Sequence, residues 1–196
     1  MKNKKWLIIG AIVVGLGIIG MFVDDDIEET PQTTPQVSQN NNEDEVIDVS
    51  NLELSDVKYE DAIKSINKYI GEVKVDGSKV IVSFKEDMPI LSEKSLVEEM
   101  AIDGVDIFQK AFENKKANTV ELLARTKFID SYGKEEVKDA VKIVWTREIS
   151  DKVDYSNYKN LLYQDYAKLY MIAESFTIHP GIWNELDQKD KDNMSM

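Results

Sequence analysis

A charge-free apolar run near the N-terminus constrains this chain more than any other feature. Residues 6–23 read WLIIGAIVVGLGIIGMFV, which is 18 residues without a charged side chain. As a helix this run covers roughly 27 Å, close to the hydrocarbon thickness of a bilayer. It therefore predicts one transmembrane helix that contacts lipid. The side chains expected to anchor it are Trp6, Leu7, Ile8, Ile9, Ile12, Val13, Val14, Leu16, Ile18, Ile19, Met21, Phe22 and Val23.

Charges on either side of the run predict its orientation. Residues 1–5 read MKNKK, and Asp24, Asp25 and Asp26 follow the run directly. Because basic flanks stay in the cytoplasm, we expect a cytoplasmic N-terminus, an extracytoplasmic C-terminal part and location in the plasma membrane. A cleaved signal peptide is one alternative, although its apolar region is usually about 7–15 residues long and ends at a small-x-small site. A buried helix of a soluble domain is the other.

Small residues within the run offer a route to weak self-association. Gly10, Gly15, Gly17 and Gly20 interrupt it, and Ala11 forms a small-xxx-small pair with Gly15. Such pairs let two membrane helices approach closely, so weak homo-oligomerisation through the helix is one expectation. Glycine is also common in helices that do not associate, and the run contains no strict GxxxG pair. A helix without a partner is therefore the alternative.

The next segment has the composition of a tether. Residues 24–50 are acidic and then rich in Thr, Pro, Gln and Asn, with few apolar side chains. Such a segment cannot bury enough surface to offset the ordering of its backbone, so we predict a disordered linker. Its typical reach would be about 25–30 Å. Residues 187–196 also lack apolar periodicity and are predicted to be a disordered tail, which leaves residues 51–186 as the folded extracytoplasmic domain.

Hydrophobic periodicity predicts three helical regions in the folded part. Apolar side chains at three- and four-residue spacing predict helices over residues 55–70, 92–114 and 157–176. Ser55 is the expected cap of the first. Ser92 or Ser95 is the expected cap of the second, in which Ser95 and Glu98 match a capping box.

Two β-hairpins are predicted between these helices. Residues 72–85 place an Asp-Gly turn at 76–77 between two β-branched runs. Residues 119–129 and 137–149 form a second pair, joined by a turn in which Gly133 suits a positive φ. The order helix, hairpin, helix, hairpin, helix predicts a compact α+β domain with a small antiparallel sheet covered by helices.

Four short motifs in residues 130–183 carry a resemblance to other proteins. They read DSYGK at 130–134, KIVW at 142–145, VDYSNY at 153–158 and IHPGIW at 178–183. This stretch resembles a domain of uncharacterised exported or membrane-anchored proteins of Gram-positive bacteria. The resemblance implies an extracytoplasmic location and a similar fold, and it implies no activity. Such proteins commonly carry a lipid-attachment cysteine, which this chain lacks, so the helix would be its anchor.

Charge and composition argue against several classes of function. The chain has 37 acidic and 24 basic residues, a net charge of −13, and Lys2, Lys4 and Lys5 lie before the apolar run. The remaining body is therefore still more acidic and would repel phosphate backbones, so no nucleic-acid partner is expected. The absence of cysteine rules out disulfides, thiol nucleophiles and zinc–thiolate sites.

The remaining candidates for chemistry lack partners at recognisable spacing. His179 is the only histidine and accompanies no nucleophile elbow, so it is predicted to be a turn residue. Asp103 and Asp106 share a predicted helix and are interpreted as solvated carboxylates. No catalytic residue, metal ligand or cofactor is therefore predicted.

Tyrosines in the last predicted helix give the only candidate site. Tyr163, Tyr166 and Tyr170 recur at i, i+3 and i+7, which would place them on one helical face. Tyrosine is favoured at interfaces because it joins apolar area to a polar tip, so these three form a candidate surface for a protein partner. The alternative is that such tyrosines complete the core.

Together these features predict a non-enzymatic protein of the cell envelope. The leading hypothesis is a single-pass membrane-anchored extracytoplasmic binding or accessory domain, which serves as a protein-interaction component of an envelope or transfer assembly. One alternative is a cell-wall-directed hydrolase whose two carboxylates lie far apart in the sequence. The other alternative is a purely structural subunit of a membrane complex.

Overall fold

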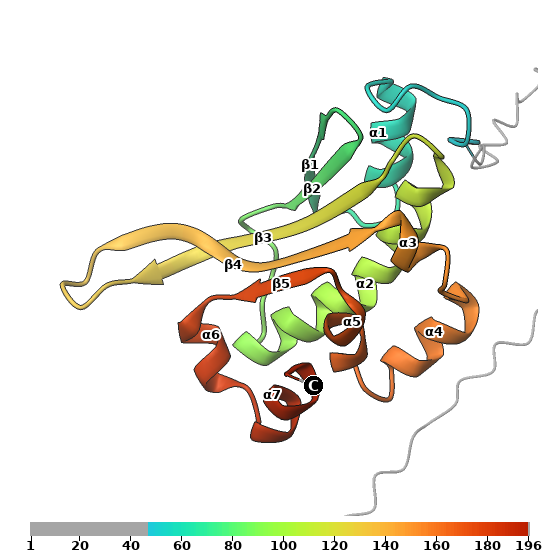
Figure 1. Cartoon of the computed structure of the whole chain (residues 1–196). Coiled ribbons are helices and arrows are strands. Elements are labelled where there is room, and N and C mark those ends of the chain that lie inside the picture. Colours follow the sequence, from blue (N-terminus) through green and yellow to red (C-terminus); the bar gives the residue numbers. More distant parts are fainter. Residues whose placement is uncertain (1–46, 196) are drawn as a thin grey trace, which may run out of the picture. The chain divides into compact units, whose positions relative to one another are not determined.

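The computed structural model describes residues 47–195 (Figure 1). The predicted membrane segment, residues 6–23, lies outside the described residues, as does most of the predicted linker. Within residues 47–195, no helix is long and apolar enough to cross a bilayer. Val49, at the end of the predicted linker, is fully buried, so the ordered domain begins slightly earlier than the sequence predicts.

The described chain is a compact α+β domain in which helices cover a five-stranded mixed sheet. Its helices are α1 (Val57–Lys64), α2 (Glu93–Glu113), α3 (Arg147–Ser150), α4 (Tyr155–Leu162), α5 (Ala167–Ile172), α6 (Pro180–Glu185) and α7 (Gln188–Met194). Its strands are β1 (Ile70–Asp76), β2 (Lys79–Phe84), β3 (Thr119–Ile129), β4 (Glu135–Thr146) and β5 (Ser175–Ile178).

The strands lie in the order β1-β2-β3-β4-β5. The prediction of an all-antiparallel sheet is wrong at one place, because β2 and β3 pair in parallel, with Val80 opposite Val120. Parallel neighbours need a long crossover, and α2 provides it (Figure 1). β3 and β4 continue past their neighbours as a two-stranded arm, since β2 pairs β3 only as far as Leu123 and β5 reaches only Val141.

Both predicted hairpin turns are confirmed. Gly77 joins β1 to β2 with a φ of 61°, and Gly133 joins β3 to β4 with a φ of 78°. Both values lie in the left-handed region that glycine adopts without steric cost. The predicted capping box is shifted by three residues, because Ser92 and Ser95 cap α2 reciprocally.

Two predicted helical regions are shorter than expected. α1 is capped by Asp56 instead of Ser55 and ends at Lys64, because the chain turns back and Ile70 pairs with Phe84 in the sheet. The region predicted as one helix over residues 157–176 is divided into α4, α5 and β5. Sheet pairing explains its end, since residues 175–178 lie antiparallel to β4.

The core lies between α2 and one face of the sheet. Phe108 on α2 stacks on Trp145 of β4, with ring centroids 4.4 Å apart and planes 2° from parallel. Gly104 lets α2 lie close to the sheet, because a Cβ atom there would lie 2.9 Å from Leu122 Cδ1 of β3. Gly104 therefore serves the close packing of α2 against the sheet.

The predicted disordered tail is instead part of the domain. Residues 188–194 form α7, and Met194 is buried. The Asp190 carboxylate is also buried and lies 2.9 Å from Lys94 Nζ. Two distant contacts therefore order a segment whose own composition indicates disorder.

Candidate functional site

The corner where β4 meets α3 fixes the position of the candidate site. Arg147, the first residue of α3, donates hydrogen bonds to the carbonyl oxygens of Phe112, Asn114 and Ala117. These carbonyls belong to the last turn of α2 and to the residues just after it, where backbone acceptors lack helical partners. The guanidinium thus ties α3 to the end of the central helix.

α4 follows after a short connection and begins at a strong cap. Asp154 Oδ1 accepts from Asn157 N at 3.2 Å, and its Oδ2 accepts from Asn157 Nδ2 at 2.7 Å. A capping aspartate satisfies a free N–H of the first turn and favours the positive end of the helix dipole. The two helices therefore meet at a defined angle and leave a hollow between them.

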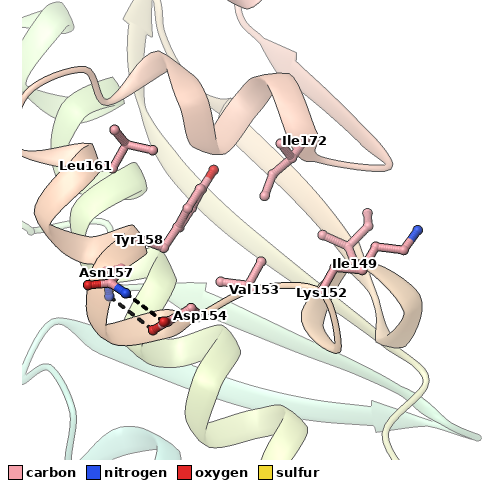
Figure 2. A pocket seen from close by; sticks show the side chains of 8 residues that line it. All are labelled: Ile149, Lys152, Val153, Asp154, Asn157, Tyr158, Leu161 and Ile172. Carbon is pink, nitrogen blue, oxygen red and sulfur yellow. Dashed lines mark hydrogen bonds between the residues drawn. The ribbon is translucent and has the colours of Figure 1, made fainter.

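This hollow is an open groove of about 650 Å³ (Figure 2). The groove is bounded by α3, by the connection to α4, by α4 itself and by α5. Its lining is largely apolar. The lining residues are Ile149, Lys152, Val153, Asp154, Asn157, Tyr158, Leu161 and Ile172. Figure 2 shows the side chains of Ile149, Val153, Tyr158 and Ile172 directed toward a common space, whereas the Lys152 amine points away from it.

Tyr158 presents its ring to the groove and not a free hydroxyl. Its Oη donates to the Lys168 carbonyl oxygen at 2.7 Å, which joins α4 to α5. Its ring packs edge-on against Trp145, with centroids 6.1 Å apart. Burial raises the pKa of Tyr158 well above its usual range, so the hydroxyl stays protonated. The tyrosine therefore adds apolar area to the site.

Two apolar side chains of the lining remain partly open to solvent. Leu161 and Ile172 line the groove and are each 37% exposed. Their sequence neighbours Met171 and Tyr163 are also exposed. Exposed apolar side chains in a concave surface are typical of an interaction site.

The charged rim of the groove is acidic on balance. Lys152 Nζ lies 2.7 Å from Glu148 Oε1, and this hydrogen bond lowers the pKa of Glu148. Asp154 lines the groove, and Asp151 lies 3.8 Å from the Arg147 guanidinium. Lys152 is therefore offset by Glu148 and Asp151 by Arg147, and Asp154 contributes the remaining negative charge.

The predicted tyrosine surface is not found as one exposed face. Tyr166 is 7% exposed and donates to Asp190, and Tyr170 is 1% exposed and donates to the Val97 carbonyl oxygen. Only Tyr163 is exposed, at 62%. The helix ends near Tyr163, so the i, i+3, i+7 relationship does not hold across the three residues. Their expected common surface is therefore corrected: two of them complete the core.

Sequence reasoning missed Leu161 and Ile172 as surface residues. The apolar spacing over residues 157–176 places both Leu161 and Leu162 in the core, and the structure buries only Leu162. Adjacent residues of a helix point about 100° apart, so one of two consecutive leucines can point away from the core. This offset was the available signal for an exposed leucine on α4.

The other candidates for chemistry are occupied by structural contacts. His179 caps α6, where its Nδ1 accepts from Gly181 N, and its ring stacks on Phe128. Asp103 accepts from Asn67, and Asp106 pairs with Lys159. In the part of the chain that the structure describes, no group of three or more His, Cys, Asp or Glu side chains is placed to hold a metal.

Comparisons with protein-family models, with curated proteins and with solved structures find no match to this chain. The function of the groove is therefore inferred from its geometry, its lining and its charge. The resemblance of residues 130–183 to exported Gram-positive proteins stays an expectation about location and fold.

Proposed function

We propose that this chain is a membrane-anchored binding protein whose extracytoplasmic domain takes a protein partner in the groove between α3, α4 and α5. It would serve as an interaction component of an envelope or transfer assembly. The observation that supports this proposal is the open apolar groove of about 650 Å³, bordered by the half-exposed Leu161 and Ile172. Completing the burial of such side chains contributes on the order of 1 kcal/mol each.

The polar groups of the groove support binding over chemistry. The Tyr158 hydroxyl is committed to Lys168, and both oxygens of Asp154 accept from Asn157. A general acid or base needs a proton-transferring group that can reach the substrate. These two groups instead hold α4 in place, and the surface they leave is apolar.

The hydrolase alternative has a specific geometric requirement. Two carboxylates would have to face each other at roughly 5 to 9 Å across a cleft. Asp154 is the one carboxylate that lines this groove. A purely structural subunit would differ from the proposal in holding its partner permanently, and photo-crosslinking would detect the partner in either case.

The membrane part of the proposal rests on residues 6–23 and on the acidic segment behind them. A flexible linker of this length would let the domain reach about 25–30 Å from the membrane. A tethered groove could then meet partners in or near the same membrane at a raised effective concentration.

Site-specific photo-crosslinking in intact cells tests the groove. A photoreactive amino acid would replace Leu161 or Ile172 in the full chain, with Val57 on α1 as an exposed apolar control outside the groove. We expect both groove positions to give the same adduct, and we expect the control to give none. Equal labelling from all three positions, or none from the groove, would contradict the proposal.

Protease treatment of intact protoplasts tests the topology separately. The domain should be removed while residues 1–5 stay protected, because the lysines are expected on the cytoplasmic side. Protection of the domain would overturn the extracytoplasmic assignment and leave the groove itself untouched.

A further inference from the structure

The kind of partner can be specified further, provided that the proposed function of the groove holds. We infer that the groove between α3, α4 and α5 binds a basic amphipathic helix of a protein partner. Three properties of the site lead to this occupant: its walls, the state of its polar groups and the sign of its rim charge.

The polar groups favour a helix over an extended peptide. A bound strand would need a row of backbone partners such as a sheet edge, whereas this groove is lined by helices and the connection between them, and its Asp154 and Tyr158 side chains already have partners. A helix satisfies its own backbone and needs only apolar contact along one face. The groove between α4 and α5, with Leu161 and Ile172 at its border, provides such contact in the helix-in-groove manner.

The rim favours a basic partner over an acidic one or a fatty acid. Asp154 carries the excess charge, because Lys152 is paired with Glu148 and Asp151 is paired with Arg147. An anionic headgroup would therefore lie beside a carboxylate, and the one lysine of the lining is already paired. The whole chain carries a net charge of −13, which also attracts basic segments and repels acidic ones.

A designed peptide provides a direct test. The probe is an amphipathic helix of about 18 residues made of leucine and lysine, long enough to be helical on binding. The full chain is held in nanodiscs of zwitterionic lipid, with empty nanodiscs as the blank. Since the chain has no cysteine, Asn160→Cys on α4 places one dye beside the groove, and Val57→Cys places it on α1.

We expect the fluorescence of the dye at position 160 to change saturably as peptide is added. The fluorescence of the dye at position 57 should change little. Leu161→Glu and Ile172→Glu should each weaken binding roughly tenfold or more, whereas Val57→Glu adds the same charge at an exposed apolar site and should not. Asp154→Asn should flatten the salt dependence while keeping the helix cap, because asparagine caps as well as aspartate.

Three results would overturn the inference. The first is equal binding of a leucine–glutamate peptide, which would remove the charge preference. The second is equal binding of a scrambled leucine–lysine peptide of the same composition, which would remove the helical face. The third is displacement of the probe by oleate at comparable concentration, which would identify a lipid-type occupant.

Failure of this inference and failure of the proposed function give different results. If no peptide binds but Leu161 and Ile172 still give a common adduct in cells, the groove binds a partner of other chemistry. If the peptide fails and the adduct is absent, both proposals fail. If the peptide binds in the predicted pattern and the adduct is absent, the occupant chemistry holds and the cellular role is wrong.

Discussion

Tyr166 donates a hydrogen bond of 2.8 Å to the carboxylate of Asp190, which is only 8% exposed. The two residues are 24 positions apart and join the start of α5 to α7. Lys94 Nζ of α2 lies 2.9 Å from the Asp190 carboxylate and 2.5 Å from the Asp187 carboxylate. The buried charge of Asp190 is therefore compensated. Burial and the neighbouring Asp190 raise the pKa of Tyr166, which keeps it a hydrogen-bond donor.

Tyr166→Phe is expected to loosen α7. Loss of one donor leaves a buried carboxylate partly unsatisfied, which costs about 1–3 kcal/mol of unfolding free energy. Urea denaturation measures the loss, and hydrogen exchange should show faster exchange in residues 188–194. Tyr163→Phe is the matched control, because Tyr163 is exposed and its loss should cost less than about 0.5 kcal/mol. Equal effects of the two changes would contradict the assignment.

Arg147→Lys is expected to destabilise the domain by about 2–3 kcal/mol despite keeping the charge. A lysine lacks the planar fork that donates simultaneously to three carbonyl oxygens at and just after the end of α2. Thermal unfolding measures the change. Arg125→Lys is the control, since Arg125 makes one exposed ion pair with Asp139 and should shift stability little. A neutral Arg147→Lys would mean that the corner is held by its apolar contacts.

Gly104→Ala is expected to destabilise the domain by about 1–2 kcal/mol. Alanine favours a helix by up to about 1 kcal/mol, but overpacking a core typically costs about 1–3 kcal/mol. The new methyl would lie 2.9 Å from Leu122 Cδ1, and Leu122 is fully buried and has little room to move. Gln109→Ala, at an exposed position of the same helix, should be close to neutral. Denaturant midpoints compare the two, and a stabilised Gly104→Ala would show that the helix can shift.

Asp103→Asn is expected to remove a pH dependence of stability. Desolvation raises the pKa of Asp103, against the opposing hydrogen bond from Asn67. Because the folded state holds this proton more tightly than the unfolded state, the wild type loses stability as the pH rises from about 4 through the raised pKa. The variant keeps an acceptor for Asn67 and lacks this loss.

Urea midpoints at pH 4, 5, 6 and 7 check this prediction. The stability of the variant relative to the wild type should increase as the pH rises. It should then stay constant above the pKa of Asp103 in the folded state. A stability difference between variant and wild type that increases toward low pH would mean that the folded state favours ionised Asp103. Glu86→Gln, at an exposed carboxylate, serves as the control.

Much of the fold could be predicted from the sequence because its signals are local. The turns at Gly77 and Gly133 need a positive φ, and a two-residue pattern of β-branched side chains marks the strands beside them. The start of α2 was also readable, since a serine followed three residues later by a second polar side chain caps a helix. These features depend on neighbours within a few positions.

The features that failed depend on contacts between distant residues. The helix predicted to reach Ile70 stops at Lys64, because residues 70–76 gain a strand partner in residues 79–84. The parallel pairing of β2 with β3 follows from the path of α2 across the sheet, which no local pattern contains. For the same reason the sequence predicted a disordered tail in place of α7 and an exposed face for Tyr166 and Tyr170. The order and burial of these segments depend on contacts with Lys94, Asp190 and Val97.

The apolar run at residues 6–23, the acidic segment behind it and the α+β class can be read along the chain, because hydrophobicity and its period are local properties. The groove depends on how distant segments pack together. It exists because Arg147 and Asp154 fix the angle between α3 and α4, and because α5 returns beside them to place Ile172 opposite Leu161. Which face of a helix is left uncovered is set by what else packs against it, and that information lies in contacts between distant parts of the chain.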